Sequence, residues 1–142
     1  MAQRFYSTSS AGEYVDLREA VLRSLPSDNG LYMPESVPVM DSAFWAHWRD
    51  WPFAEVSYRI ASSLFAGAVP EETLREMVGD AINFDAPVVT IAEKMHVLEL
   101  FHGPSLAFKD FGARFMARLM GWLTREDDRD LMVLVATSGD TG

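Results

Sequence analysis

One lysine lies where a charged side chain is unusual. Lys109 falls within a predicted helix, and its neighbours three, four and seven residues further on are Gly112, Ala113 and Met116, which make a small and apolar helix face. Burial and the positive end of a helix both disfavour the protonated amine, so a lysine in this setting can serve as a Schiff-base nucleophile. A lysine that extends its amine past the apolar face into water fits the same pattern, and periodicity alone favours that ordinary interpretation.

A second candidate is the loop Ala136-Thr137-Ser138-Gly139-Asp140-Thr141-Gly142, which follows a strongly apolar segment. Backbone N–H groups and hydroxyls at the carboxyl end of a strand can hold a carboxylate or a phosphate. Asp140 is unexpected there, because a carboxylate repels an anion unless it accepts a hydrogen bond or pairs with a cation. An ordinary strand-to-helix turn has the same composition.

The remaining candidates are weaker. His47, His96 and His102 lack the spacing of metal ligands, so no metal site is predicted. Ser105 and Ser138 have no recognisable base partner, so the sequence does not support serine hydrolase chemistry. Asp110, Arg114 and Arg118 recur every four residues and are expected to form one solvated stripe on the helix that carries Lys109.

Composition narrows the class of protein further. The 142 residues are 49% hydrophobic and carry a net charge of -9, so a core is possible while nucleic acid and membrane surfaces are not expected as partners. The chain has no cysteine, which excludes disulfides, thiolate metal sites and cysteine nucleophiles and fits a cytoplasmic setting. No export signal is recognisable. The longest apolar run, Leu131 to Ala136, is far shorter than the roughly 20 residues that span a bilayer.

The N-terminal part is predicted to be mostly helical. Asp16 and Asp41 (or Ser42) are typical helix-capping residues, and Pro70 suits a first helical position. A turn over residues 26–30 precedes an extended segment at 31–34. The helices are expected at about residues 16–24, 42–51, 53–65 and from 70 onward. On the last, Leu74, Met77, Val78 and Ala81 form the buried face, and an aromatic stripe on the second is expected to pack in the core: Phe44, Trp45, Trp48 and Trp51.

The pattern of apolar residues changes near Pro87. Strands are predicted at 88–91, 96–101 and 131–135, the last buried on both faces, with a long helix before it. Strand, helix and strand in this order predict a parallel βαβ unit. The fold class is therefore α/β, with a helical domain at 1–86 and the incomplete beginning of a parallel-sheet domain at 87–142. Because a covering helix is expected after Gly142, we interpret the chain as the front part of a longer protein.

Three motifs in this order carry a resemblance to a known family. They are Asp28-Asn29-Gly30-Leu31-Tyr32-Met33-Pro34, Phe101-His102-Gly103-Pro104-Ser105-Leu106-Ala107-Phe108-Lys109-Asp110-Phe111-Gly112, and the loop from Ala136 to Gly142. Over nearly its whole length the chain resembles the threonine synthases, pyridoxal-phosphate enzymes of the tryptophan-synthase-β group (fold type II). Ser105 stands where the family often has threonine, which is a mild departure.

The resemblance implies a cofactor, a substrate and a set of site residues. Lys109 would bind pyridoxal 5'-phosphate covalently and shuttle protons at the α and β carbons of the substrate, O-phospho-L-homoserine, which water converts to L-threonine and phosphate. Asp140 would lie near the phenolic oxygen of the cofactor, where related enzymes often have asparagine. The residues implied to line the cofactor ring and the substrate carboxylate are Ser138, Gly139, Asp140, Thr141 and Gly142.

The same resemblance implies that the 142 residues alone are inactive. In the family, the glycine-rich seat for the cofactor phosphate and the partner of the pyridine nitrogen come later in the chain. Three alternatives stay open: a threonine-synthase-like phospho-lyase, another amino-acid eliminase on this scaffold, and a non-catalytic module that binds an anion or a protein. The sequence leaves the oligomeric state undetermined.

Overall fold

The computed structural model describes residues 2–10, 12–128, 130–137 and 139. The chain divides into two compact units, residues 1–78 and 79–142, and each is described by itself. This division falls within a helix, and the predicted domain boundary near Pro87 stays a prediction.

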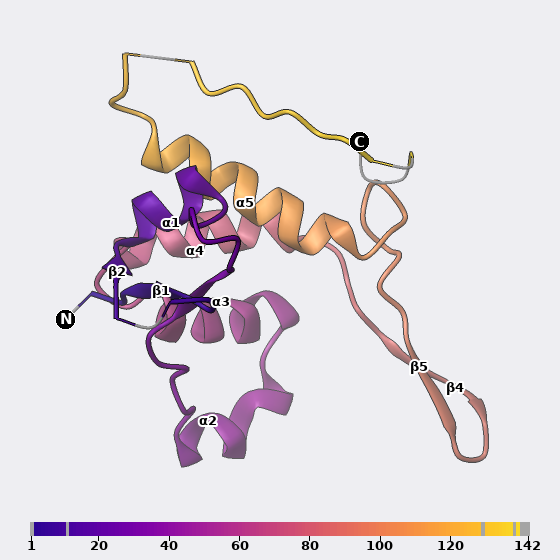
Figure 1. Ribbon diagram of the computed structural model, residues 1–142. Helices are drawn as coiled ribbons and strands as arrows, with labels where there is room; N and C mark the ends of the chain where they lie inside the picture. Colours follow the sequence, from indigo (N-terminus) through magenta and orange to yellow (C-terminus); the bar gives the residue numbers. More distant parts are fainter. Residues whose placement is uncertain (1, 11, 129, 138, 140–142) are drawn as a thin grey trace. The chain divides into compact units, whose positions relative to one another are not determined.

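The first unit contains a small antiparallel sheet (Figure 1). Its strands are β1 (Phe5–Ser7), β2 (Tyr14–Val15) and β3 (Tyr32–Pro34), in the order β2-β1-β3. Phe5 lies opposite both Val15 and Pro34. The extended segment predicted at 31–34 is confirmed as β3, whereas β1 and β2 are too short to show the alternation by which strands are recognised.

A hydrogen-bonded turn precedes β3. The carboxylate of Asp28 accepts hydrogen bonds from the hydroxyls of Ser7, at 2.7 Å, and Ser10, and from the backbone N–H of Gly30 at 3.0 Å. A Cβ atom on Gly30 would collide with the Ser7 hydroxyl and lie 2.9 Å from the backbone nitrogen of Ser9. The turn therefore has room only for glycine at this position.

Because of these hydrogen bonds, we expect the free energy of unfolding to fall at acid pH. Hydrogen bonds from Ser10, Ser7 and the Gly30 amide lower the pKa of Asp28 below its ordinary value of 3.8. The ionised carboxylate thus stabilises the fold above that ordinary value, and the contribution disappears as pH falls through the lower pKa of the folded state. In urea unfolding between pH 2 and 7, Asp28→Asn is expected to show a weaker dependence on pH than the unsubstituted protein. The exposed control Asp128→Asn should retain the full dependence; equal slopes for all three proteins would contradict the assignment.

The four helices predicted in the first unit are present, but the one predicted at 42–51 ends at His47, and the fourth begins at Glu71, one residue after the predicted Pro70. Asp16 caps α1 (Leu17–Arg23) and Asp41 caps α2 (Ser42–His47), each by accepting a hydrogen bond from the backbone N–H three residues on. A 3₁₀ turn at Trp48–Asp50, labelled η1, follows α2. The next two helices are α3 (Phe53–Leu64) and α4 (Glu71–Ala81).

The core of the first unit is formed mainly by α1 and α4. Three of the α4 residues predicted to be buried, Leu74, Met77 and Val78, are at most 6% exposed, and Ala81, at the start of the second unit, is fully buried. The other buried apolar residues of the first unit are Leu17, Ala20, Phe44 and Val69. The aromatic stripe of α2 was only partly predicted correctly, because Phe44 is buried while Trp45 is 58% exposed.

The second unit contains a hairpin and a long helix. The strands β4 (Val88–Ala92) and β5 (Met95–Leu98) pair antiparallel, and every residue in them is exposed. A loop leads from β5 to α5 (Lys109–Leu123), the predicted long helix (Figure 1). No helix among the described residues is long and apolar enough to cross a bilayer.

The prediction of a parallel βαβ unit was wrong for this structure. Both sheets in the described residues are antiparallel, and residues 131–137 form no strand. Leu134 is 87% exposed, although it was expected to be buried on a two-sided strand. An apolar run becomes a strand only where the backbone of a neighbouring segment forms hydrogen bonds with it. The strand β5, which was expected to lie in the same sheet as residues 131–135, pairs with β4.

The prediction that Asp110, Arg114 and Arg118 form a solvated stripe on α5 was also wrong. Asp110 is buried, and Arg114 is half-buried. The Arg114 guanidinium donates hydrogen bonds to the backbone carbonyls of Asp80, at 2.6 Å, and Ala81, at 3.0 Å. These carbonyls belong to the last turn of α4, where a cation is favourable. Arg114 thus connects α5 to the last turn of α4.

Candidate functional site

Lys109 is the first residue of α5. Its side chain is half-buried, short of the enclosure expected for a lysine kept from water. Its helical neighbours Gly112, Ala113 and Met116 are all exposed, so the small apolar face predicted beside the amine lies open.

The loop before Lys109 contains a tight turn. The backbone N–H of Leu106 donates a hydrogen bond to the carbonyl of Gly103 at 3.0 Å. Leu106 has a φ of 56°, a left-handed conformation that costs free energy for a residue other than glycine. Phe108, which precedes α5, provides no side-chain cap. Contacts from elsewhere must therefore hold this loop in place.

Asp110 makes that contact, and sequence reasoning missed it. The residue is 6% exposed, and its carboxylate accepts a hydrogen bond from the backbone N–H of Ser105 at 2.8 Å. A Cβ atom on Gly103 would lie 2.5 Å from the Oδ2 atom of Asp110. The one signal in the sequence was an acidic residue in the first turn of a helix, and such residues usually face solvent.

Of the second group of predicted site residues, Ser138 to Gly142, the structure describes only Gly139. Gly139 has a φ of 122°, and its backbone N–H donates a hydrogen bond to the hydroxyl of Thr137 at 2.9 Å. In this conformation that N–H group is used inside the loop. The other predicted members, Ser138, Asp140, Thr141 and Gly142, lie outside the described residues, so their place beside Lys109 stays a prediction.

The histidines take part in local contacts. The Nε2 atom of His102 lies 2.7 Å from Glu99, and the Nδ1 atom of His96 lies 2.9 Å from the Thr90 hydroxyl. Within the described ranges, no three or more His, Asp or Glu side chains are arranged to hold a metal ion.

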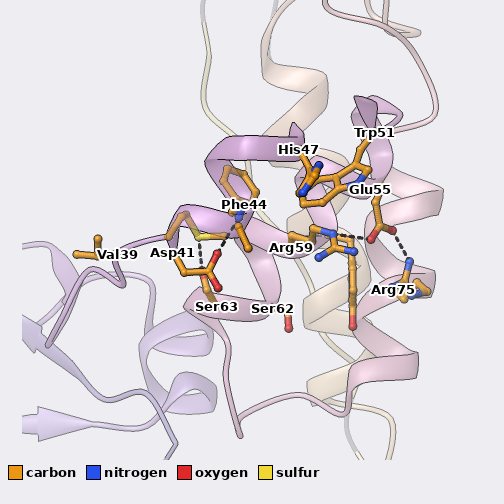
Figure 2. A pocket seen from close by; sticks show the side chains of 13 residues that line it. Val39, Asp41, Phe44, His47, Trp51, Glu55, Arg59, Ser62, Ser63 and Arg75 are labelled. Atoms are coloured by element: carbon orange, nitrogen blue, oxygen red, sulfur yellow. Dashed lines mark hydrogen bonds and ion pairs between the residues drawn. The ribbon is translucent and has the colours of Figure 1, made fainter. Parts of the chain in front are cut away.

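A hollow of about 600 Å³ in the first unit is lined in part by charged side chains (Figure 2). Glu55 of α3 bridges two arginines: its Oε1 lies 2.8 Å from Nε of Arg59, and its Oε2 lies 2.6 Å from a terminal nitrogen of Arg75. The guanidinium of Arg59 lies over the Trp51 ring at 3.9 Å, and that of Arg75 over the Tyr58 ring at 3.7 Å.

The ion pairs at this hollow join two helices. Hydrogen bonds from Arg75 and Arg59 lower the pKa of Glu55 below its ordinary value, against the opposing effect of burial. The same contact with Glu55 raises the pKa of Arg75. Both arginines are thus fixed by one carboxylate and an aromatic ring each, and the network connects α3 to α4.

The sequence and the structure both match one family of pyridoxal-phosphate enzymes. A family profile described as "Threonine synthase N terminus" matches residues 4–82. The chain therefore belongs to the threonine synthase family, as the resemblance implied.

Individual relatives support this assignment. The chain is 40% identical over 137 residues to threonine synthase from Haemophilus influenzae, covering 96% of this chain and 31% of the relative. It is 37% identical over 139 residues to threonine synthase from Escherichia coli, covering 98% and 32%. The chain thus spans about a third of the length of the curated relatives it matches.

Solved structures agree with the sequence relatives. The crystal structure of threonine synthase from Escherichia coli superposes with a TM-score of 0.88 at 36% identity, covering 97% of this chain and 32% of that one. The PLP-bound threonine synthase from Brucella melitensis gives a TM-score of 0.81 at 29% identity over 87% of this chain and 28% of that one.

Proposed function

We propose that these residues act as the N-terminal third of a threonine synthase, which converts O-phospho-L-homoserine and water to L-threonine and phosphate. The observation that carries the proposal is the likeness to the Escherichia coli enzyme over 97% of this chain, which takes in the segment around Lys109. The relatives that match nearly the whole chain are named threonine synthases.

The residues around Lys109 fit pyridoxal phosphate. The cofactor needs an amine for covalent attachment and an open surface for its flat ring. Lys109 supplies the amine at the start of α5, and the exposed face of Gly112, Ala113 and Met116 supplies such a surface. The positive end of the helix also favours a negatively charged group nearby.

The chemistry divides between cofactor and protein. Bound pyridoxal phosphate supplies an electron sink for negative charge that develops at the α carbon of the substrate. Lys109 holds the cofactor, and its amine takes and returns protons at the α and β carbons. The residues Ser138 to Gly142 would contribute hydroxyls and backbone N–H groups to binding of the substrate carboxylate, and Asp140 would interact with the phenolic oxygen of the cofactor.

An assay of products tests the proposal. The complete gene product, purified with pyridoxal phosphate, is expected to release threonine and phosphate from O-phospho-L-homoserine in equal amounts. The 142-residue chain assayed in parallel should be inactive, because the family resemblance implies that the seat for the cofactor phosphate comes later in the chain.

Other outcomes identify the alternatives. Phosphate without threonine would indicate a phospho-lyase. Activity on phosphothreonine or serine alone would indicate another eliminase. Absence of a visible absorption band and of any turnover would indicate a module that binds an anion or a protein. Each of these results would contradict the proposed reaction.

A further inference from the structure

Asp110 is oriented unlike most acidic residues at the start of a helix. Carboxylates in a first turn usually face solvent and interact with the free N–H groups of their own helix. Asp110, the second residue of α5, is only 6% exposed, and its Oδ2 atom accepts a hydrogen bond from the Ser105 N–H in the preceding loop. The carboxylate therefore connects the helix to the loop that leads into it.

Gly103 and Asp110 fit together as a pair. A Cβ atom at position 103 would lie 2.5 Å from Oδ2, 2.7 Å from Cβ and 2.9 Å from Cγ of Asp110. The carboxyl group thus occupies the space that a side chain at position 103 would need. This close packing fixes the loop against the first turn of α5 at a second point, besides the hydrogen bond to Ser105.

The loop needs such support. Leu106 is left-handed, with a φ of 56°, and a conformation of this kind persists only where its surroundings hold it. The helix begins at Lys109 without a side-chain cap from Phe108. Hydrogen bonds from the Asp110 and Phe111 N–H groups to carbonyls three residues back, each 3.2 Å long, close the first turn. Loss of the contact between Asp110 and Ser105 would therefore loosen the backbone that carries Lys109.

We propose that Asp110 is a positioning residue for Lys109. Its carboxylate fixes the loop at 103–108, and thereby the start of α5 and the direction in which the Lys109 side chain leaves the helix. The effect depends on the place of the acceptor oxygen and not on the negative charge. This inference rests on the proposed function, in which Lys109 holds pyridoxal phosphate.

Two variants separate geometry from charge in the complete gene product. Asp110→Asn keeps a carbonyl oxygen within reach of the Ser105 N–H but removes the charge, whereas Asp110→Glu keeps the charge and displaces the acceptor by one methylene. Asp128→Asn, at an exposed carboxylate beyond α5, is the matched control for loss of charge. The three readouts are the affinity for pyridoxal phosphate, the pH midpoint of the visible absorption, and hydrogen exchange at the Ser105 amide.

The two Asp110 variants are expected to give different results. Asp110→Glu should weaken cofactor binding by about tenfold or more, move the pH midpoint, and speed exchange at Ser105. Asp110→Asn and Asp128→Asn should stay close to the unsubstituted protein in all three. A general loss of stability would not move the pH midpoint, so that readout distinguishes positioning from a merely structural role.

Two results would overturn the inference. One is an Asp110→Glu protein with unaltered affinity and pH midpoint; the other is an Asp110→Asn protein as impaired as Asp110→Glu, because charge would then be decisive. Failure of the unsubstituted protein to bind pyridoxal phosphate is a separate outcome. It overturns the proposed function, and the Ser105 exchange rates of the variants would then still show whether Asp110 holds the loop.

Discussion

Replacement of Lys109 by alanine is expected to abolish the visible absorption of bound pyridoxal phosphate in the complete gene product. It should also lower the rate of threonine formation by about 1,000-fold or more, since loss of a residue that both holds a cofactor and moves protons removes most of the catalysis. Absorption spectra and phosphate release measure the two effects. The fold should survive, because Lys109 is only half-buried and is the first residue of its helix.

The sequence offers a matched control for this experiment. The chain contains two lysines, and the other, Lys94, lies exposed in the turn between β4 and β5. Lys94→Ala removes the same charge and the same amine from the second unit, and activity and absorption should be unchanged. A visible band that persists in Lys109→Ala, or one that disappears in Lys94→Ala, would refute the assignment of Lys109.

Leu74→Ala is expected to lower the free energy of unfolding strongly. Leu74 is 1% exposed in the middle of α4, so truncation removes apolar burial and leaves a cavity in the core. Such changes cost about 2–5 kcal/mol, a large part of the stability of a typical domain. Urea unfolding followed by tryptophan fluorescence measures the loss, because Trp45, Trp48 and Trp51 lie in the same unit.

Leu25→Ala is the matched control for Leu74→Ala. Leu25 is 59% exposed just after α1, so the same truncation there should cost about 0.5 kcal/mol or less. If the two variants unfolded at the same urea concentration, α4 would not lie in the core as described.

Helix positions were predictable because their signals are local. The capping carboxylate of Asp16 acts on an N–H group three residues away, and the spacing of Leu74, Met77 and Val78 defines one helix face. The structure confirms both predictions. The position of Lys109 on a helix beside a small apolar face was predictable in the same way.

The sheet of the first unit was less predictable than its helices because its paired strands are distant in sequence. Phe5 pairs with Pro34 across 29 residues, and two or three residues per strand are too few for a pattern. The apolar run at 131–135 satisfies the pattern of a buried strand, yet its residues are exposed and unpaired as a strand. An apolar run indicates that a segment is suited to burial. It forms a strand only where the backbone of a neighbouring segment supplies hydrogen-bond partners.

By itself, the sequence determined which family the chain resembles, where its helices begin, and which amine is the candidate for chemistry, because each depends on residue types within one or two helical turns. Only the tertiary structure decided the orientation of Asp110 toward Ser105, the packing of its carboxyl group against Gly103, and the antiparallel sheets. An acidic residue in a first turn has the same sequence signal whether it faces water or a folded loop. The difference arises only when the backbone of the preceding loop brings an N–H group within hydrogen-bonding distance.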